Sequence, residues 1–201
     1  MTVASGLHVR QRVKRKDGAT PKFQERKSLK GNLRSRKGQR IFFRVPAPMK
    51  ILDILDKRSI IPQLTSKSKE GVLRELVHVL SQVEKQVSED RTIEILLERE
   101  SLGSTGIGEG VAIPHGKSKE VNKILTSFGR SLPGLDFQSL DGKPTHLFFL
   151  LLAPENSAGM HLKALAQISR LMKDHTFRKH LMEARTADEI YSIFSEGDEK
   201  V

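Results

Sequence analysis

The stretch THLFFLLLA, residues 145–153, constrains the chain most, because it is apolar without interruption from Leu147 to Ala153. It is far too short to cross a bilayer, which takes about 20 apolar residues in a helix. It has the length of a β-strand, and a strand that is apolar at successive positions is buried on both faces. We therefore expect this strand at the centre of a sheet that is covered on two sides.

Segments with helical periodicity can supply that cover. In the third of them Leu162, Leu165, Ile168 and Met172 are expected to face inward. The predicted helices are residues 68–86, 88–103, 156–174, 176–184 and 186–196. Further strands are predicted near residues 59–63, 110–115 and 122–131. Helices that flank a small, buried sheet give an α/β fold class.

Charge divides the chain into two parts. Residues 1–48 hold 14 Lys and Arg against 2 Asp and Glu, whereas the remainder holds 21 against 22. The basic segment is too poor in apolar residues to offset its ordering entropy, so we expect a disordered extension. A domain is expected over residues 49–197, followed by a tail at 198–201.

The role of the basic segment stays open between three readings. It is an arm that contacts nucleic acid or an acidic partner, a solvated tail, or sequence upstream of a start at Met49. Any nucleic-acid binding would be confined to residues 1–48.

Composition excludes several classes of site. The chain has no cysteine, so it forms no disulfide and no thiolate metal site. His175 and His180 are five residues apart and no HExxH motif occurs, so no metal site is predicted. The basic N-terminus lacks the apolar core of a secretory signal, and without a membrane span a cytoplasmic location is expected.

The stretch GSTGIGEGVAIPHG, residues 103–116, is the strongest candidate for chemistry. It lacks the Gly-Lys-Ser/Thr of a phosphate-binding P-loop. It also runs from helix to strand, the reverse of a dinucleotide fingerprint. Its glycines allow a backbone turn whose free amides form a nest for an anion.

His115 follows Pro114 in this stretch and is expected at the end of a strand with its ring accessible. A neutral imidazole is a nucleophile near pH 7 and can accept a phosphoryl group. Arg99, at the end of the preceding helix, is a candidate cation for that group. His161, near the start of a later helix, could reach the same site. Each of these residues also has a plainer interpretation. His115 can be an inert loop histidine, Arg99 can complement the helix dipole, and His161 can be a solvated residue in the first turn of its helix.

Three segments resemble a known family. They are LLERESLGSTGIGEGVAIPHGK, LLLAPENSAGMHLKALAQISRLMKD and LMEARTADEIYSIF. Residues 49–197 resemble the enzyme IIA domain, fructose–mannitol type (type 2), of the bacterial phosphoenolpyruvate-dependent phosphotransferase system. Within that family they are most similar to its nitrogen-regulatory branch.

The resemblance implies a three-layer α/β/α sandwich around a small mixed sheet. It implies that His115 accepts the phosphoryl group from a histidine phosphocarrier protein, that Arg99 clamps the phosphate, and that His161 orients ring and phosphate. It implies no metal and no organic cofactor. It also implies that the backbone borders the phosphate pocket at Ser104, Thr105, Gly106, Gly108 and Gly116.

Transport members of the family often carry a cysteine-bearing IIB domain and a membrane IIC domain. This sequence has neither cysteine nor membrane span, so it cannot complete sugar transport alone. We expect a regulator whose phosphorylation state is read by partners. The alternative is a sugar-specific component that donates to a separate IIB protein.

Overall fold

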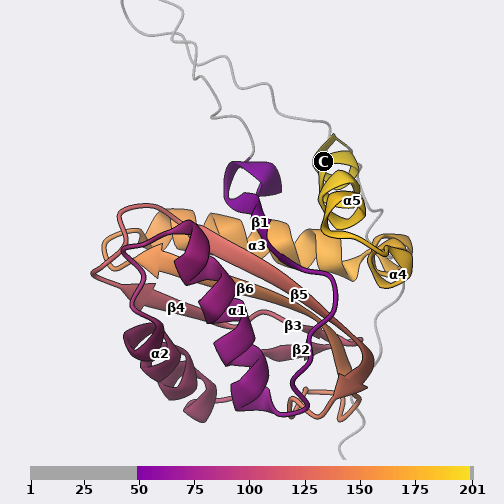
Figure 1. Ribbon diagram of the computed structural model, residues 1–201, viewed down its shortest axis with the longest axis horizontal. Helices are drawn as coiled ribbons and strands as arrows, with labels where there is room; N and C mark the ends of the chain where they lie inside the picture. The colour runs from indigo at the N-terminus through magenta and orange to yellow at the C-terminus, as the bar shows by residue number, and fades with distance from the viewer. Residues whose placement is uncertain (1–48, 200–201) are drawn as a thin grey trace, which may run out of the picture. The chain divides into compact units, whose positions relative to one another are not determined.

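A computed structural model of the chain describes residues 49–199 (Figure 1). The basic segment expected to be disordered, residues 1–48, lies outside this range, as do residues 200 and 201. The helices are η1 (Ile51–Asp53), α1 (Lys69–Val83), α2 (Glu89–Ser101), α3 (Ala158–Lys173), α4 (His175–Glu183) and α5 (Ala187–Glu199). The strands are β1 (Leu55–Ile61), β2 (Gly106–Gly108), β3 (Val111–Ala112), β4 (His115–Ser118), β5 (Leu125–Leu135) and β6 (Thr145–Pro154).

The sheet is mixed and has β6 at its centre. Its order is β1-β5-β6-β3-β2, and β4 also pairs with β6. Strand β5 is antiparallel to β6, whereas β3 and β4 are parallel to it and follow one another along its other side. The segment 110–115, predicted as one strand, is therefore two short strands separated by Ile113 and Pro114.

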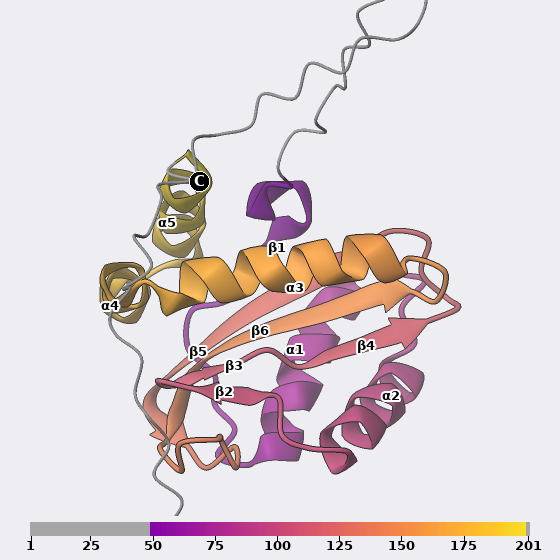
Figure 2. The same ribbon diagram turned by 180° about the vertical axis from the view of Figure 1, so that it is seen from behind.

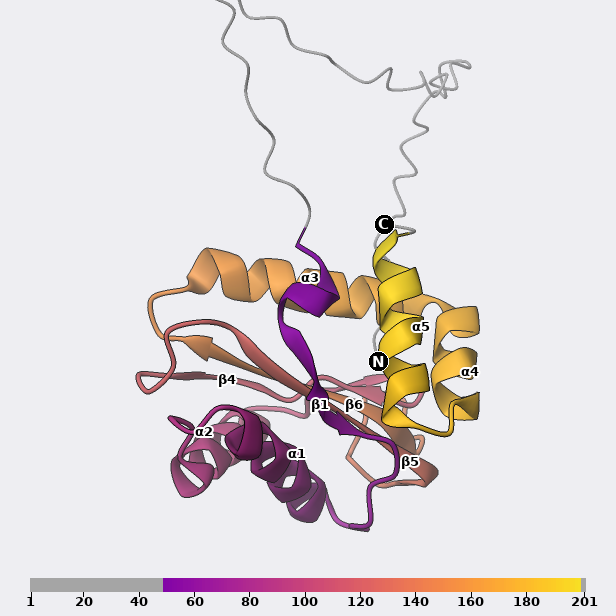
Figure 3. The ribbon, with the colours of Figure 1, turned by 45° about the horizontal axis from the view of Figure 1, so that its top comes forward.

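Strand β6 contributes alternate residues to two hydrophobic cores, as its uninterrupted apolar run predicted. Phe149 and Leu151 pack with α3, α4 and α5, and Phe148 and Leu150 pack with α1 and α2. Figures 1 and 2 show α3 on one face of the sheet and α1 and α2 on the other. Figure 3 shows β1 between α1 and α5. The predicted three-layer α/β/α arrangement is confirmed.

One helix face and one strand boundary differ from the prediction. Leu162 is 66% exposed instead of inward, because the buried side of α3 runs through Ala164, Ile168 and Leu171, which lie about 120° to 180° around the helix from Leu162. Strand β1 begins at Leu55, earlier than residue 59, because its charged residues 56–58 conceal the strand pattern.

The predicted tail is shorter than expected. Helix α5 continues to Glu199, and Asp198 is 8% exposed. The Asp198 carboxylate accepts hydrogen bonds from the backbone N–H of Ile51 at 2.8 Å and of Leu52 at 3.0 Å. This buried contact ties the end of α5 to the first turn of the described chain.

Candidate functional site

His115 is the first residue of β4 and its ring is half-buried, so it lies in the sheet and not in a loop. Its position on the sheet is fixed by pairing with Leu151 of β6. The ring Nδ1 lies 2.8 Å from the carbonyl oxygen of Ile113. Because a carbonyl oxygen only accepts hydrogen bonds, Nδ1 carries the proton in the neutral ring. The lone pair is then on Nε2.

Arg99 approaches that Nε2 atom from the last turn of α2. Its Nε donates to Nε2 of His115 at 3.2 Å, and its Nη1 donates to the carbonyl oxygen of Gly103 at 2.9 Å. Arg99, expected to supply the cation of this site, thus lies beside His115 in the structure. The second hydrogen bond orients the guanidinium plane toward the ring.

His161 completes a cluster of three side chains. It is in the first turn of α3, and its ring centroid lies 5.6 Å from that of His115 at an interplanar angle of 52°. Its Nε2 atom is buried and has no hydrogen-bond partner among the described residues. A buried polar nitrogen without a partner is costly in the resting protein. In the tautomer that carries its proton on Nε2, this atom can donate to an oxygen that arrives on His115.

Both histidines are held toward the neutral form. Burial lowers the pKa of His115, and the adjacent Arg99 charge lowers it further, against the Ile113 carbonyl and the Glu100 carboxylate, which raise it. Burial also lowers the pKa of His161, with smaller contributions from His115 and Lys117. A neutral ring keeps its nucleophilic lone pair at neutral pH.

The glycine-rich loop does not form the expected anion nest. The amides of Thr105, Gly106 and Gly108 donate to the side chains of Glu100, Ser104 and Ser139, respectively. These amides are therefore occupied by the protein itself. The Ser104 hydroxyl in turn donates to the Phe137 carbonyl.

Two glycines of the loop region serve close packing instead. A Cβ at Gly116 would lie 2.5 Å from Cγ2 of Ile95, and one at Gly106 would lie 2.9 Å from Cα of Ser139. Gly116 thus allows α2, with Arg99 at its end, to approach β4. This close approach brings the guanidinium within reach of His115.

Sequence reasoning missed Glu100, a neighbour of Arg99 that is buried behind the loop. A signal for it existed, because Glu100 lies four residues after Leu96 and seven after Ile93, on the inward face of α2. A carboxylate at such a position needs partners.

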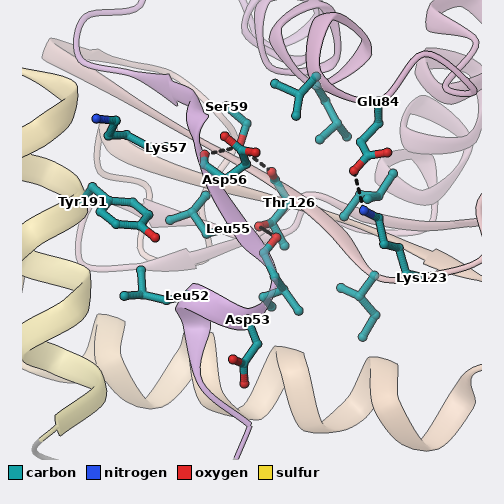
Figure 4. A pocket seen from close by; sticks show the side chains of 15 residues that line it. Leu52, Asp53, Leu55, Asp56, Lys57, Ser59, Glu84, Lys123, Thr126 and Tyr191 are labelled. Carbon is teal, nitrogen blue, oxygen red and sulfur yellow. Dashed lines mark hydrogen bonds and ion pairs between the residues drawn. The ribbon is translucent and has the colours of Figure 1, made fainter.

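A cavity of about 370 Å³ lies elsewhere, at the β1 edge of the sheet (Figure 4). Its Glu84 carboxylate pairs with Lys123 at 2.6 Å. The Ser59 hydroxyl donates to two carbonyl oxygens, and the Thr126 hydroxyl donates to a third. Because these polar groups already have protein partners, the cavity is a weaker candidate for a ligand site than the histidine cluster.

No group of three or more His, Asp or Glu in residues 49–199 could hold a metal ion. Within the same residues no helix is long and apolar enough to cross a membrane.

Comparison with known proteins connects this geometry to one family. Residues 53–197 match the family model described as "Phosphoenolpyruvate-dependent sugar phosphotransferase system, EIIA 2". A nitrogen regulatory protein of Bradyrhizobium diazoefficiens is 44% identical over 147 residues, which cover 73% of this chain and 95% of that protein.

Two further proteins are similar over the same region. The fructose-specific EIIABC component of Bacillus subtilis is 43% identical over 150 residues, which cover 75% of this chain but 24% of that longer protein. The crystal structure of the nitrogen regulatory protein IIA-Ntr from Neisseria meningitidis aligns with a TM-score of 0.67 and 35% identity. The alignment covers 72% of this chain and 98% of that one.

Proposed function

Because this chain belongs to the EIIA type 2 family of the phosphoenolpyruvate-dependent sugar phosphotransferase system, and so is a phosphoryl-transfer component, we propose that His115 is its phosphoryl acceptor. The observation that carries the proposal is the joint approach of Arg99 and His161 to one imidazole whose Nε2 lone pair is unprotonated.

Nε2 of His115 is the reacting nitrogen in this proposal. The proton stays on Nδ1, hydrogen-bonded to the Ile113 carbonyl throughout, so the ring needs no separate base. As the phosphoryl group arrives, the bond from phosphorus to the donor's nitrogen breaks and the bond from phosphorus to Nε2 forms. Catalysis of this step consists mainly of positioning and charge neutralisation.

Arg99 and His161 supply the neutralisation. The Nε–H of Arg99 now points at the lone pair that must attack, so it moves from Nε2 to a phosphoryl oxygen during transfer. Its bond to the Gly103 carbonyl keeps the guanidinium nearby. The unpartnered Nε2 of His161, as its N–H tautomer, donates to a second phosphoryl oxygen and so gains the partner that it lacks at rest.

A histidine phosphocarrier protein is the proposed donor. Large apolar side chains are exposed next to the two functional elements, at Leu102 (82%) after α2 and at Met160 (50%) and Leu162 (66%) beside His161. In this proposal these exposed apolar side chains contribute to the surface on which the donor docks. Such a role would account for the exposure of Leu162.

We propose a regulatory role for the phosphorylated protein. Relatives that carry the name nitrogen regulatory protein match this chain over nearly their whole length. The alternative, donation to a separate IIB protein in sugar transport, is favoured by the 43% identity to part of a fructose-specific EIIABC component. Adding a purified fructose-type IIB domain to the phosphorylated protein distinguishes them, because a transport component loses its label to that domain.

Labelling tests the acceptor directly. The full chain is incubated with phosphoenolpyruvate and the purified upstream proteins, and acid-labile phosphate is measured. We expect His115→Ala to abolish labelling, and His175→Ala, at an exposed histidine of α4, to label like the wild type. Equal labelling of His115→Ala and the wild type contradicts the proposal. Phosphorus–nitrogen couplings in NMR spectra then show whether phosphorus is on Nε2.

A further inference from the structure

Glu100 is a buried carboxylate whose two oxygens have different partners. One oxygen, Oε1, accepts hydrogen bonds from the backbone N–H of Thr105, at 2.9 Å, and from the Thr105 hydroxyl. The other, Oε2, accepts from Nζ of Lys69 at 3.0 Å. The Glu100 side chain is 5% exposed. This carboxylate therefore joins the start of α1, the end of α2 and the loop before β2.

A chain of hydrogen bonds leads from this carboxylate to the imidazole. Glu100 holds Thr105 by accepting from the Thr105 N–H. The carbonyl oxygen of Thr105 in turn accepts from the backbone N–H of Ile113 at 3.0 Å. The carbonyl oxygen of Ile113 accepts from Nδ1 of His115 at 2.8 Å. The orientation of the ring thus depends on Ile113, and the position of Ile113 depends on Thr105.

Lys69 holds the Glu100 carboxylate in place through a hydrogen bond to Oε2. Its ammonium group also donates to Oε1 of Gln138 at 2.9 Å and lies 4.6 Å from the centroid of the Phe137 ring. The Lys69 side chain is only 20% exposed. A buried charge pair of this kind is costly unless its remaining hydrogen bonds are satisfied, and here they are.

We infer that Glu100 is a positioning residue, which holds the His115 imidazole in its Nδ1–H tautomer and in line for phosphoryl transfer through Thr105 and Ile113. The expected effect on the rate of transfer rests on the proposed function, whereas the expected effect on the tautomer of His115 does not.

Glu100→Gln tests the inference with little change in shape. The amide NH₂ cannot accept a hydrogen bond, so either Thr105 or Lys69 loses its acceptor. We expect the maximal rate of transfer from the phosphocarrier to fall about tenfold to a hundredfold, as when a supporting residue is removed or a reacting group is misplaced. The donor concentration at half-maximal rate should stay unchanged, because the docking surface is intact.

The ring itself gives a readout that needs no donor. Nitrogen-15 NMR of the full chain reports the Nδ1–H fraction of His115, which we expect to fall in Glu100→Gln. Thr105→Val removes the hydroxyl and leaves the N–H, so it should shift both readouts in the same direction but less. It also serves as the second variant if Glu100→Gln folds poorly. Glu98→Gln, an exposed carboxylate on the same helix, is the matched control and should change neither.

The outcomes separate the two claims. If Glu100→Gln and Thr105→Val keep the wild-type tautomer and the wild-type maximal rate, the positioning role is overturned while labelling of His115 still supports the proposed function. If the wild-type protein accepts no phosphoryl group, the proposed function fails, and the tautomer measurement alone decides whether Glu100 orients the ring.

Discussion

Arg99 and Arg130 carry the same guanidinium group but have different acceptors. Arg99, at the end of α2, is partly exposed and donates to a ring nitrogen of His115 and to one carbonyl. Arg130, in β5, is 4% exposed. Its donors point at backbone carbonyls of Pro62, Leu181, Met182 and Ala184.

The acceptors explain the difference in role. Three of the carbonyls around Arg130 lie at the end of α4, where a helix has carbonyl groups without intrahelical partners. Arg130 satisfies these permanently, so it stabilises the packing of α4 on the sheet. The acceptor of Arg99 is His115, which in the proposed function is a nucleophile that changes on phosphorylation. One arginine therefore contributes to stability, and the other is available for chemistry.

Arg99→Ala should give the largest effect, which we expect on the rate of phosphoryl transfer and not on stability. Removing a donor to developing charge slows a reaction about 10²- to 10³-fold. Stability should change by less than about 1 kcal/mol, because a partly exposed arginine contributes little. Single-turnover transfer and urea unfolding measure the two quantities. Arg91→Ala, on the exposed face of the same helix, is the control, and a loss of stability without slower transfer would reverse the roles assigned to the two arginines.

Arg130→Met should produce the opposite pattern. It leaves buried carbonyls without donors, and we expect the free energy of unfolding to fall by about 3 kcal/mol. Transfer measured where the variant is folded should match the wild type, because no atom of Arg130 contacts His115. Arg74→Met, at an arginine whose side chain is 56% exposed, provides the comparison and should cost less than about 0.5 kcal/mol. Equal losses in the two variants would contradict a structural role for Arg130.

The two arginines also differ in what the sequence disclosed. Arg99 could be singled out because it precedes a glycine-rich stretch that ends in Pro-His-Gly. Arg130 sits in an alternating strand pattern that looks like any half-exposed strand, and three of its four acceptors lie at the end of α4, about 50 residues later. Local periodicity carries no information on such a pairing, so sequence analysis did not identify it.

Local periodicity also explains which other features could be predicted from the sequence and which were missed. The apolar run of β6 and the helical stripes fixed the layers, because burial follows directly from periodicity. The loop amides were misassigned as an anion nest, because their acceptors, Glu100 and Ser139, are set by tertiary contacts. Leu162 was placed inward because apolar character alone does not distinguish a buried side chain from an exposed one.

Gly116→Ala should have an intermediate effect and touch both properties. Its Cβ would lie 2.5 Å from Cγ2 of Ile95, so α2 must shift away from β4 and carry Arg99 with it. We expect a loss of about 1–3 kcal/mol in stability, as for other overpacked cores, together with slower transfer. Unfolding and single-turnover measurements follow both.

A second substitution sharpens this test. Ile95→Ala removes the methyl group that the new Cβ would meet, so the double variant should recover transfer relative to Gly116→Ala. Gly159→Ala, where a Cβ meets open space in α3, should leave transfer unchanged. Failure of the double variant to recover would show that contact with Ile95 is not what limits the approach of α2.

The smallest expected effect is on the titration of His115. Burial first and then the Arg99 charge lower its pKa below the usual value of 6.5. Arg99→Ala removes the charge and admits water, and both changes should raise the pKa toward that value. Arg130→Met should not alter it. NMR titration of the imidazole in the three proteins measures the difference directly.

The sign of the pH dependence follows from that lowered pKa. Below about pH 6.5 the unfolded chain binds a proton at His115 that the folded chain resists, so this residue's contribution to stability is present above pH 6.5 and is lost as the pH falls through the folded pKa. Phosphoryl transfer by the wild type should likewise persist on acidification to pH 6. At that pH a larger fraction of the His115 imidazole should be protonated in Arg99→Ala than in the wild type. If both proteins show the same titration and the same acid limb, Arg99 acts on the phosphoryl group alone and not on the resting ring.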